Sequence, residues 1–293
     1  MIILNECEFG NVVELLNQEK VHSIFAYAVV EGIQKGKIYV DTNMNPKCCL
    51  IVCESGKYLV AGETINDDFN EFIQEYLLNR KNHRNYFDLY CSSTKWIVKL
   101  NKMLGNNAAK LSRELFVWDY SKLSSILKWS EIKENGNGFE VKKMNSTLFE
   151  KYIKEVDSSY KNLWGSSDNF LKNGFGFCVL KDNKFVSVCN TYYVRQGVAE
   201  IDIITMDEFR SKGFALLACS EFIKHCVKND IKPVWDCDKD NENSKKLAIK
   251  LGFKIVETYE MYWWHKNRKF VEEYLNKFNY NTKKYEGEIY EVN

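Results

Sequence analysis

The sequence predicts an α/β fold with a mixed sheet, and two observations predict it. Apolar runs of strand length alternate with runs of helical periodicity along most of the 293 residues. In the C-terminal half, three strand-like runs are separated only by short turns; they are residues 175–181, 184–195 and 198–205. After them come a helical run, a short buried strand and a second helical run, at 214–228, 233–237 and 241–252.

Residues 1–133 are expected to form a separate α/β lobe. Its helical runs are 12–16, 24–30, 67–78 and 94–104, and its strand-like runs are 37–40, 49–53, 58–61 and 86–90. No internal repeat is visible in the sequence. The lobe contains no basic, glycine-containing loop like the one that stands out in the second half.

Residues 134–293 are expected to form the second α/β unit. The polar segment Glu134–Gly138, with its two glycines, is the best linker between the two. Asp182-Asn183 reads as a tight hairpin turn, and Arg195–Gly197 joins the next pair of strands. The charged, tyrosine-rich tail contains one helical run, at 270–278.

The most informative segment is Phe209–Ala215, which connects an apolar strand-like run to the helical run 214–228. The first N–H groups of a helix have no intrahelical partner, and the helix dipole adds positive potential there. Gly213 lets the backbone approach a ligand, and Arg210 and Lys212 add cationic donors. The segment therefore predicts a phosphate or pyrophosphate site. The alternative interpretation is an ordinary solvated turn.

A second segment strengthens this prediction. Pro233–Cys237 reads as a buried strand, and the helix after it begins at asparagine or aspartate residues and ends before Gly252. Arg210-x-x-Gly213-x-Ala215 resembles the acyl-CoA pyrophosphate motif of the GNAT acetyltransferase superfamily. The pattern from Asn241 through Ser244, Leu247 and Lys250 to Gly252-Phe253 is similar to the second signature of that superfamily.

Further pieces resemble the zwittermicin-resistance type of GNAT protein; they are Gly176–Leu180, Ser187–Cys189, Glu200, Thr205 and Pro233–Cys237. The resemblance implies a GNAT fold in residues 134–293, a degenerate GNAT-like lobe in residues 1–133, and acetyl-CoA (coenzyme A) as cofactor. In the superfamily the fourth and fifth strands separate, and the thioester arm lies between them. The residues expected to hold the cofactor are Ile203, Ile204, Thr205, Arg210, Ser211, Lys212, Gly213, Phe214, Ala215, Asn241, Asn243 and Ser244. For Asn241, Asn243 and Ser244, capping of the helix is the alternative role.

Two acids are candidates for the base that deprotonates an amine. Glu200 and Asp202 alternate with isoleucines, so a strand places both carboxylates on one face. Similarity to the strand-four acid of the superfamily favours Glu200, with Asp202 as a second base or a binder of the substrate ammonium. The alternative is a pair of acids on a solvated sheet face.

The general acid is harder to assign. Many GNAT enzymes carry tyrosine one position after Leu247, where this chain has Ala248. Tyr259 is the substitute that we include among the catalytic residues, with Tyr262 and Ser244 as alternatives.

Other reactive residues are given structural interpretations. Cys237 has no histidine nearby in the sequence to support a thiolate, and Cys48, Cys49 and Cys53 lack the spacing of a zinc site. The four histidines also lack ligand spacing, so no metal is expected. The tryptophans Trp164, Trp263 and Trp264 are candidates for a substrate pocket, with a core position as the alternative.

Composition limits the class of protein. Lys and Arg total 41 against 40 Asp and Glu, which argues against nucleic acid as a partner. No apolar run is long enough to cross a membrane, no signal peptide is evident, and most of the ten cysteines lie in apolar runs, so a cytoplasmic location is expected. The sequence leaves the oligomeric state open between monomer and homodimer.

These observations predict an acetyl-CoA-dependent N-acetyltransferase that acts directly, within a ternary complex, on a primary amine of a small molecule. The alternative hypothesis is a regulatory protein of GNAT fold that binds acyl-CoA without turnover, and Ala248 is the feature that favours it.

Overall fold

The structure is a computed structural model that describes residues 1–17, 24–91, 93–131, 138–195, 197–278 and 280. The chain divides into two compact units: unit 1 comprises Met1–Arg113 and Tyr259–Asn293, and unit 2 comprises Glu114–Thr258. These limits differ from the predicted boundary at residue 134, because β6 and β12 each contribute residues to both units. Most of the predicted linker, residues 134–137, lies outside the described residues.

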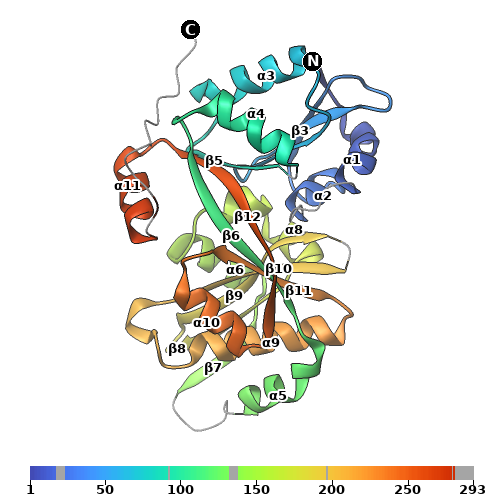
Figure 1. Ribbon diagram of the computed structural model, residues 1–293. Helices are drawn as coiled ribbons and strands as arrows, with labels where there is room; N and C mark the ends of the chain where they lie inside the picture. The colour runs from blue at the N-terminus through green and yellow to red at the C-terminus, as the bar shows by residue number, and fades with distance from the viewer. Residues whose placement is uncertain (18–23, 92, 132–137, 196, 279, 281–293) are drawn as a thin grey trace. The chain divides into compact units, whose positions relative to one another are not determined.

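The strands of unit 1 follow the order β1-β2-β3-β4-β5-β12 (Figure 1). Their bounds are β1 Ile2–Ile3, β2 Gly36–Val40, β3 Cys48–Cys53, β4 Lys57–Gly62, β5 Tyr86–Cys91 and β12 Phe253–His265. β4 and β5 are parallel, and the other neighbours are antiparallel. The four strand-like runs predicted for this half are therefore confirmed, whereas β12 was not foreseen.

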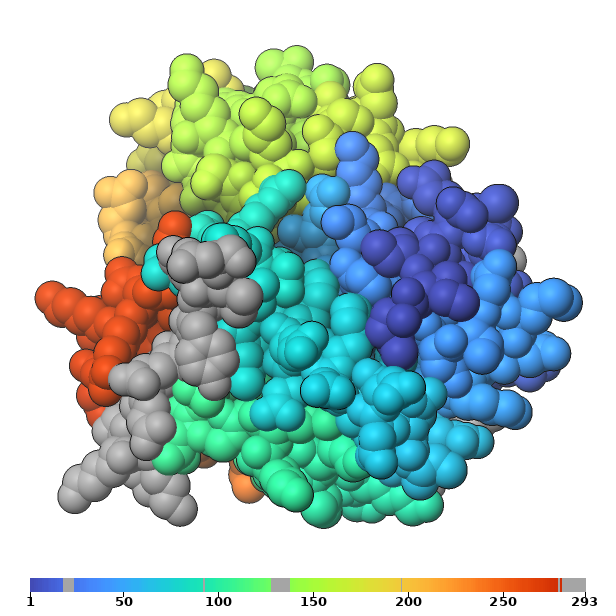
Figure 2. Space-filling view, turned by 90° about the horizontal axis from the view of Figure 1, so that it is seen from above, coloured from blue at the N-terminus to red at the C-terminus, as the bar shows by residue number. Residues whose placement is uncertain are grey.

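Helices cover both faces of this sheet. Their bounds are η1 Glu6–Val12, α1 Val13–Asn17, α2 Ile24–Val30, α3 Asp67–Leu78, η2 Arg80–Asn82, α4 Thr94–Leu104 and α11 Arg268–Lys277. α3 and α4 bury their apolar sides against Leu50, Phe87 and Leu89, and their outer sides form much of the face that Figure 2 presents. Tyr90, which alternates with Leu89, contacts Phe25 of α2 on the opposite face.

The strands of unit 2 follow the order β6-β11-β10-β9-β8-β7. Their bounds are β6 Ala109–Trp118, β7 Phe139–Lys143, β8 Gly176–Lys181, β9 Lys184–Arg195, β10 Val198–Thr205 and β11 Lys232–Asp238. β10 and β11 are parallel. Asp182 and Asn183 have φ angles of 48° and 60°, which confirms the predicted two-residue hairpin turn between β8 and β9.

Unit 2 also has helices on both faces. Their bounds are η3 Tyr120–Lys122, α5 Leu123–Glu131, α6 Ser146–Glu155, α7 Tyr160–Trp164, α8 Ser167–Asn173, η5 Asp207–Phe209, α9 Phe214–Lys228 and α10 Glu242–Lys250. α9 packs on β8 and β9, with the rings of Phe175 and Phe222 at 4.5 Å. α7 lies on the opposite face, where Tyr160 bonds to Asp202 of β10.

The two units repeat one order of elements. In each, an edge strand and short helices precede three antiparallel strands, a helix, a strand parallel to the third, a second helix and a long strand. In the first half of the chain, which supplies most of unit 1, this order runs from β1 to β6, and in the second half, which supplies most of unit 2, it runs from β7 to β12. The repeat was invisible in the sequence because it resides in topology and pairing rather than in matching residues.

Most of the cysteines and tryptophans discussed in the sequence analysis are buried. Of the ten cysteines, all are free and nine are buried, as expected of small hydrophobic residues. Trp164, Trp263 and Trp264 are also buried, and Trp263 lines a cavity as well. Among the described residues, no helix is both long enough and apolar enough to cross a membrane.

Candidate functional site

The candidate site lies in unit 2, where the pairing of β10 with β11 stops. The register covers three residues of each strand and ends where Glu200 lies opposite Val234. Beyond this pair, β10 continues to Thr205 and β11 continues to Asp238. The two parallel neighbours therefore separate toward their C-terminal ends, which is the separation that the resemblance implied.

The backbone of β10 is oriented toward this opening. The amide of Met206 and the carbonyl of Ile204 bond to β9, at 3.0 and 3.1 Å. Successive peptide groups of a strand point to opposite edges. Those of Ile203 and Thr205 consequently point away from β9, to the edge at which pairing with β11 has ended. Both residues were predicted to contact the cofactor.

The loop after β10 leads into a helix whose N-terminus has no side-chain cap. α9 begins after its N-cap Gly213, which has left-handed φ and ψ angles of 87° and −1° and provides no side chain to cap the helix. Ser211 also has a positive φ, 61°. An added Cβ at Gly213 would meet nothing within 4 Å, so the glycine is required by its backbone conformation and the space above it is open.

Two exposed cations flank this helix start. Arg210 forms an ion pair with Asp207 at 2.7 Å, and its Nε donates to the carbonyl of Thr205 at 3.4 Å. The ammonium of Lys212 donates to the carbonyl of Glu208 at 2.9 Å. Exposed ion pairs of this kind contribute little to stability, so both side chains can turn to an anion at low cost.

α10 begins at the opposite side of the opening. Asn241 is its N-cap and accepts from the amide of Ser244 at 3.3 Å, so the capping interpretation holds for Asn241. The Ser244 hydroxyl accepts from the indole of Trp235 on β11 at 2.9 Å. Asn243 is exposed on the first turn. Of the three residues predicted to contact the cofactor here, Asn241 is therefore a cap, Ser244 is held by β11, and Asn243 faces solvent.

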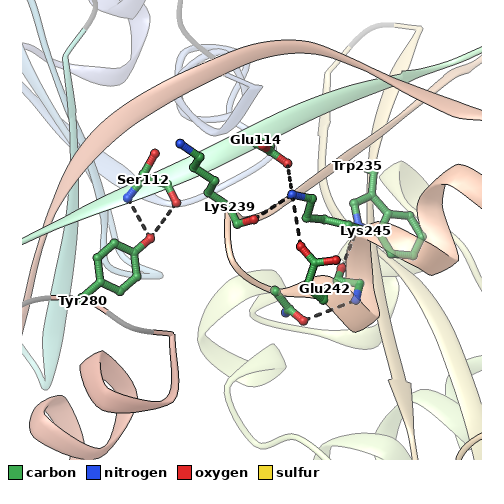
Figure 3. Close-up of polar contacts among 9 residues, drawn as sticks. Ser112, Glu114, Trp235, Lys239, Glu242, Lys245 and Tyr280 are labelled. Atoms are coloured by element: carbon green, nitrogen blue, oxygen red, sulfur yellow. Dashed lines mark hydrogen bonds and ion pairs between the residues drawn. The ribbon is translucent and has the colours of Figure 1, made fainter.

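A buried ion pair holds α10 against β6. Figure 3 shows the ammonium of Lys245 between Glu114 and Glu242, at 3.1 and 3.5 Å, with the carbonyl of Lys239 at 2.9 Å. Burial by itself would lower the pKa of Lys245, but the two carboxylates outweigh it and raise the pKa. Because breaking a buried pair leaves an uncompensated charge, this contact fixes where α10 starts.

Asp202 is an acid of the site whose pKa is raised. Burial raises its pKa to about 6. The hydrogen bond from the Tyr160 hydroxyl, at 2.7 Å, acts to lower this pKa but does not outweigh burial. The negative charges of Asp157 and Glu200 raise it further. A carboxylate that titrates close to neutral pH is suited to accept a proton during a reaction.

Glu200 lies deeper than Asp202, with 4% of its surface exposed. It is located where β9 is irregular, because the register of β9 with β10 shifts between Ala199 and Ile201. Its electrostatic effect on Asp202 agrees with the prediction that both carboxylates share a face of β10. The partner missed by sequence reasoning is Tyr160, since nothing in the sequence connects it to a strand 42 residues away.

The two tyrosines proposed as general acids belong to the other compact unit. Tyr259 belongs to unit 1, is buried, and packs on the ring of Tyr90 at 6.1 Å, so its catalytic role stays a prediction. The Tyr262 hydroxyl, also in unit 1, donates within that unit to Ile97 and Asn101. Ala248 is a fully buried residue of α10, and its methyl side chain cannot donate a proton.

Comparison with known proteins supports what the geometry indicates. Residues 14–262 match the family model described as GNAT acetyltransferase, which covers most of the chain. The chain belongs to the GNAT acetyltransferase family. An uncharacterized N-acetyltransferase of Bacillus subtilis strain 168, YdfB, is 32% identical over 245 residues, which span 84% of this chain and 92% of that protein.

Solved structures of GNAT proteins share the fold. A GCN5-related N-acetyltransferase-like protein from Streptococcus suis 89/1591 aligns with a TM-score of 0.68 and 22% identity, over 87% of this chain and 97% of the other. A tandem GNAT protein from the clavulanic acid biosynthesis pathway aligns with a TM-score of 0.59 and 9% identity, over 91% and 98%. The predicted fold class is confirmed, and this GNAT chain is an N-acetyltransferase.

Proposed function

We propose that this enzyme transfers an acetyl group from acetyl-CoA to a primary amine of a small molecule, directly and within a ternary complex. The observation that carries the proposal is the opening between β10 and β11, which begins beyond Glu200 and Val234, the last pair of their register. The uncapped N-terminus of α9 lies at the end of the same loop. The opening between the strands would receive the acyl arm, and the N-terminus of α9 would receive the diphosphate.

The chain's own residues fit acetyl-CoA, which supplies the acetyl thioester when bound. The amides at the start of α9 and the side chains of Arg210 and Lys212 would hold the diphosphate. The peptide groups of Ile203 and Thr205 would bond the pantetheine arm. A fixed backbone N–H of β10 near the thioester carbonyl would stabilise negative charge that develops there. The exposed, left-handed Gly213 leaves room for this approach.

Asp202 is the residue that we propose as the general base. An amine enters as an ammonium, with a pKa near ~10, and becomes nucleophilic when Asp202 takes the proton. The Tyr160 hydroxyl donates to Asp202 at 2.7 Å and holds its orientation. Glu200 is more deeply buried and contributes negative charge that raises the pKa of Asp202. This reverses the preference for Glu200 that the sequence suggested.

The location that we propose is the cytoplasm. The support is that nine of the ten free cysteines are buried as thiols, as in a reducing compartment. The amino-bearing antibiotics belong in the acceptor panel because of the zwittermicin-type resemblance in the sequence.

Calorimetric titration with acetyl-CoA, followed by thiol release over a panel of small amines, tests the proposal. We expect wild type to bind and to release thiol with at least one amine. Gly213→Glu should lose binding by more than about 100-fold, because the carboxylate meets the diphosphate and the residue is strained at a positive φ.

The matched control is Gly105→Glu, at the end of α4 in unit 1. Gly105 also has a positive φ, 53°, with nothing within 4 Å of an added Cβ. It puts the same side chain at a glycine of positive φ in unit 1, outside the loop, so the affinity of this variant for acetyl-CoA should equal that of wild type. Equal affinity for Gly213→Glu and wild type would show that the loop assignment is wrong. Binding without thiol release for every amine would support the regulatory alternative.

A further inference from the structure

Strand β9 buries the polar side chains of Ser187, Asn190 and Thr191, and these differ in their partners. The hydroxyl of Ser187 donates to the carbonyl of Ile204 at 3.1 Å. The hydroxyl of Thr191 donates to the carbonyl of Phe175 at 2.6 Å and accepts from its amide at 2.8 Å. Asn190 is 1% exposed, yet neither its Nδ2 nor its Oδ1 has a hydrogen-bond partner among the described residues. Because an unpaired carboxamide is costly to bury, this side chain calls for a functional explanation.

The strand register places Asn190 beside the proposed base. Its register partners are Asp202 on β10 and Gly176 on β8. Directly opposed residues of antiparallel strands point to one face, with Cβ atoms about 5 Å apart. This is the face away from α9, because Phe175, the neighbour of Gly176 in the chain, packs on Phe222 of α9. Asn190 therefore lies next to Asp202 on the face that α7 covers.

Gly176 leaves the room that the Asn190 side chain occupies. A Cβ added at Gly176 would collide with the carboxamide. Since the carboxamide has no partner among the described residues, turning it from Gly176 toward Asp202 would break no hydrogen bond to them. Asp202 keeps part of its surface exposed, so an acceptor can reach this face. The carboxamide can therefore meet an acceptor whose amine is held by Asp202.

A second donor without a partner lies on the same face. The indole Nε1 of Trp164, at the end of α7, is buried and has no hydrogen-bond partner within the described part of the chain. Its ring lies against Gly174, where an added Cβ would meet Cη2 at 2.8 Å. Gly174 has extended φ and ψ angles and precedes Gly176 by two residues, so both positions share a face and lie about 7 Å apart. An unpaired N–H is thus present near the unpaired carboxamide.

We propose that Asn190 selects the acceptor: it favours amines that carry, on the carbon next to the amine-bearing one, a neutral group that both donates and accepts hydrogen bonds. This inference rests on the proposed function, with Asp202 as the base. A hydroxyl or carboxamide of the acceptor donates to Oδ1 of Asn190 and accepts from its Nδ2, and Nε1 of Trp164 is a further donor. A site whose buried polar groups are paired only by the substrate rejects analogues that leave them unpaired.

Calorimetric titration of the full-length protein with paired amines, in the presence of coenzyme A, tests this proposal. The pairs are 2-aminoethanol with propylamine and glycinamide with 2-methylpropylamine, in which methyl groups replace the polar atoms. Wild type should bind at least one polar member about 10-fold or more tightly than its apolar partner, and the pair that shows the preference identifies the group as hydroxyl or carboxamide. Equal binding within both pairs, or no binding of any member, would overturn the proposal.

A matched pair of variants on β9 separates this role from the fold. Asn190→Leu removes the carboxamide with little change in volume, so it should unfold at the same or a higher urea concentration than wild type and bind both members of a pair equally. Thr191→Val, on the opposite face, removes two hydrogen bonds; it should unfold at lower urea and keep the wild-type preference. Asn190→Leu that unfolds at lower urea, or that keeps the preference, would refute the assignment.

The outcome can be told apart from the outcome for the proposed function. Acetyl-CoA affinity should be the same in wild type, Asn190→Leu and Thr191→Val, because none of the diphosphate-binding groups changes. Loss of acetyl-CoA binding in wild type, or absence of thiol release, counts against the proposed transfer. The preference within the amine pairs and the urea midpoints are measured without turnover, so they decide the role of Asn190 in either case.

Discussion

Unit 1 and unit 2 use the same order of elements, but they differ where unit 2 has its candidate site. In unit 2 the parallel strands β10 and β11 pair only up to Glu200 and Val234, and then separate. In unit 1 the parallel strands β4 and β5 stay paired up to Cys91, which is the last residue of β5. The same topology therefore gives an opening in one unit and a closed sheet in the other.

The helices that follow β4 and β10, which are α3 and α9, differ in how well their N-termini suit an anion. α3 of unit 1 is capped by Asn66, whose side chain accepts from Phe69 at 3.0 Å, and it carries Asp67 and Asp68 in its first turn. These acids stabilise the helix and repel an anion. α9 of unit 2 begins at Gly213 without a side-chain cap and follows two cations. Of these two helix starts, that of α9 is the one suited to an anion.

A tryptophan completes the closure in unit 1. The indole of Trp96, fully buried at the start of α4, donates to the carbonyl of Gly62 at 2.8 Å. Gly62 is the last residue of β4, so the bond ties α4 to the end of that strand. Trp235 of unit 2, which lies on β11, instead donates to Ser244 of α10. The comparison indicates that the buried sheet maintains the fold in both units, whereas the ability to bind a cofactor depends on a few groups at the ends of strands and helices.

The largest effect is expected from the acid that unit 2 places beside its opening. Asp202→Asn should lower kcat by roughly 10²- to 10⁴-fold, because the amine keeps its proton, and should leave acetyl-CoA affinity unchanged. Wild-type kcat/KM should fall as pH drops through about 6, where Asp202 becomes protonated. Rates from thiol release over a pH series measure both.

Asp68→Asn in the first turn of α3 is the matched control for that substitution, and its rate should stay within about 2-fold of wild type because it lies in unit 1. If Asp202→Asn kept the wild-type rate while Glu200→Gln lost it, the base would be Glu200.

The two units should also respond to pH with opposite signs. Burial lowers the pKa of His83 in unit 1 to about 4, so this group's stabilisation is complete above pH 6.5 and is lost as pH falls from 6.5 to 4. The pKa of Asp202 in unit 2 is raised to about 6, so its contribution is most favourable below pH 3.8 and is lost as pH rises to 6.

Urea unfolding between pH 4.5 and 7.5 measures these slopes, each on the order of 1 kcal/mol per pH unit. His83→Gln should remove the part of the stability that increases with pH, and Asp202→Asn the part that decreases with pH. Parallel changes in both variants would contradict the assigned signs.

A smaller effect separates the two tryptophans. Trp96→Phe removes the bond to Gly62 and should cost about 1–2 kcal/mol of unfolding free energy, with acetyl-CoA affinity unchanged. Trp235→Phe should cost a similar amount and also weaken acetyl-CoA, because Ser244 is then no longer held at the start of α10. Unfolding curves measure the stability of both variants, and calorimetry measures their affinity for acetyl-CoA. A loss of affinity in Trp96→Phe would contradict the proposed difference between the two units.

The smallest effect concerns the helix caps. Asn66→Ala should cost about 1 kcal/mol of stability and leave acetyl-CoA binding intact. Asn241→Ala should cost about the same and also reduce affinity, since it caps α10 beside the opening. Identical affinities for the two variants would show that the α10 cap has no part in binding.

Much of this fold was predictable because its signals are local. The helices at 67–78 and 94–104 have the predicted limits, since each has a capping side chain and an apolar face. The turn Asp182-Asn183 and the left-handed Gly252 after α10 were also predictable from residue type. β6 and β12 were missed, because their roles depend on neighbours that are distant in the sequence. The limits of the two units were missed for the same reason.

The sequence by itself determined the family, the basic loop before α9 and the two acids of β10, because helix starts, glycine conformations and strand alternation are written in consecutive residues. Only the tertiary structure decided that the pKa of Asp202 is raised, since its burial and its bond from Tyr160 require α7 to fold onto β10. It also decided that one parallel strand pair opens while its counterpart stays closed. Pairing and burial arise between segments far apart in the chain, and no local pattern specifies them.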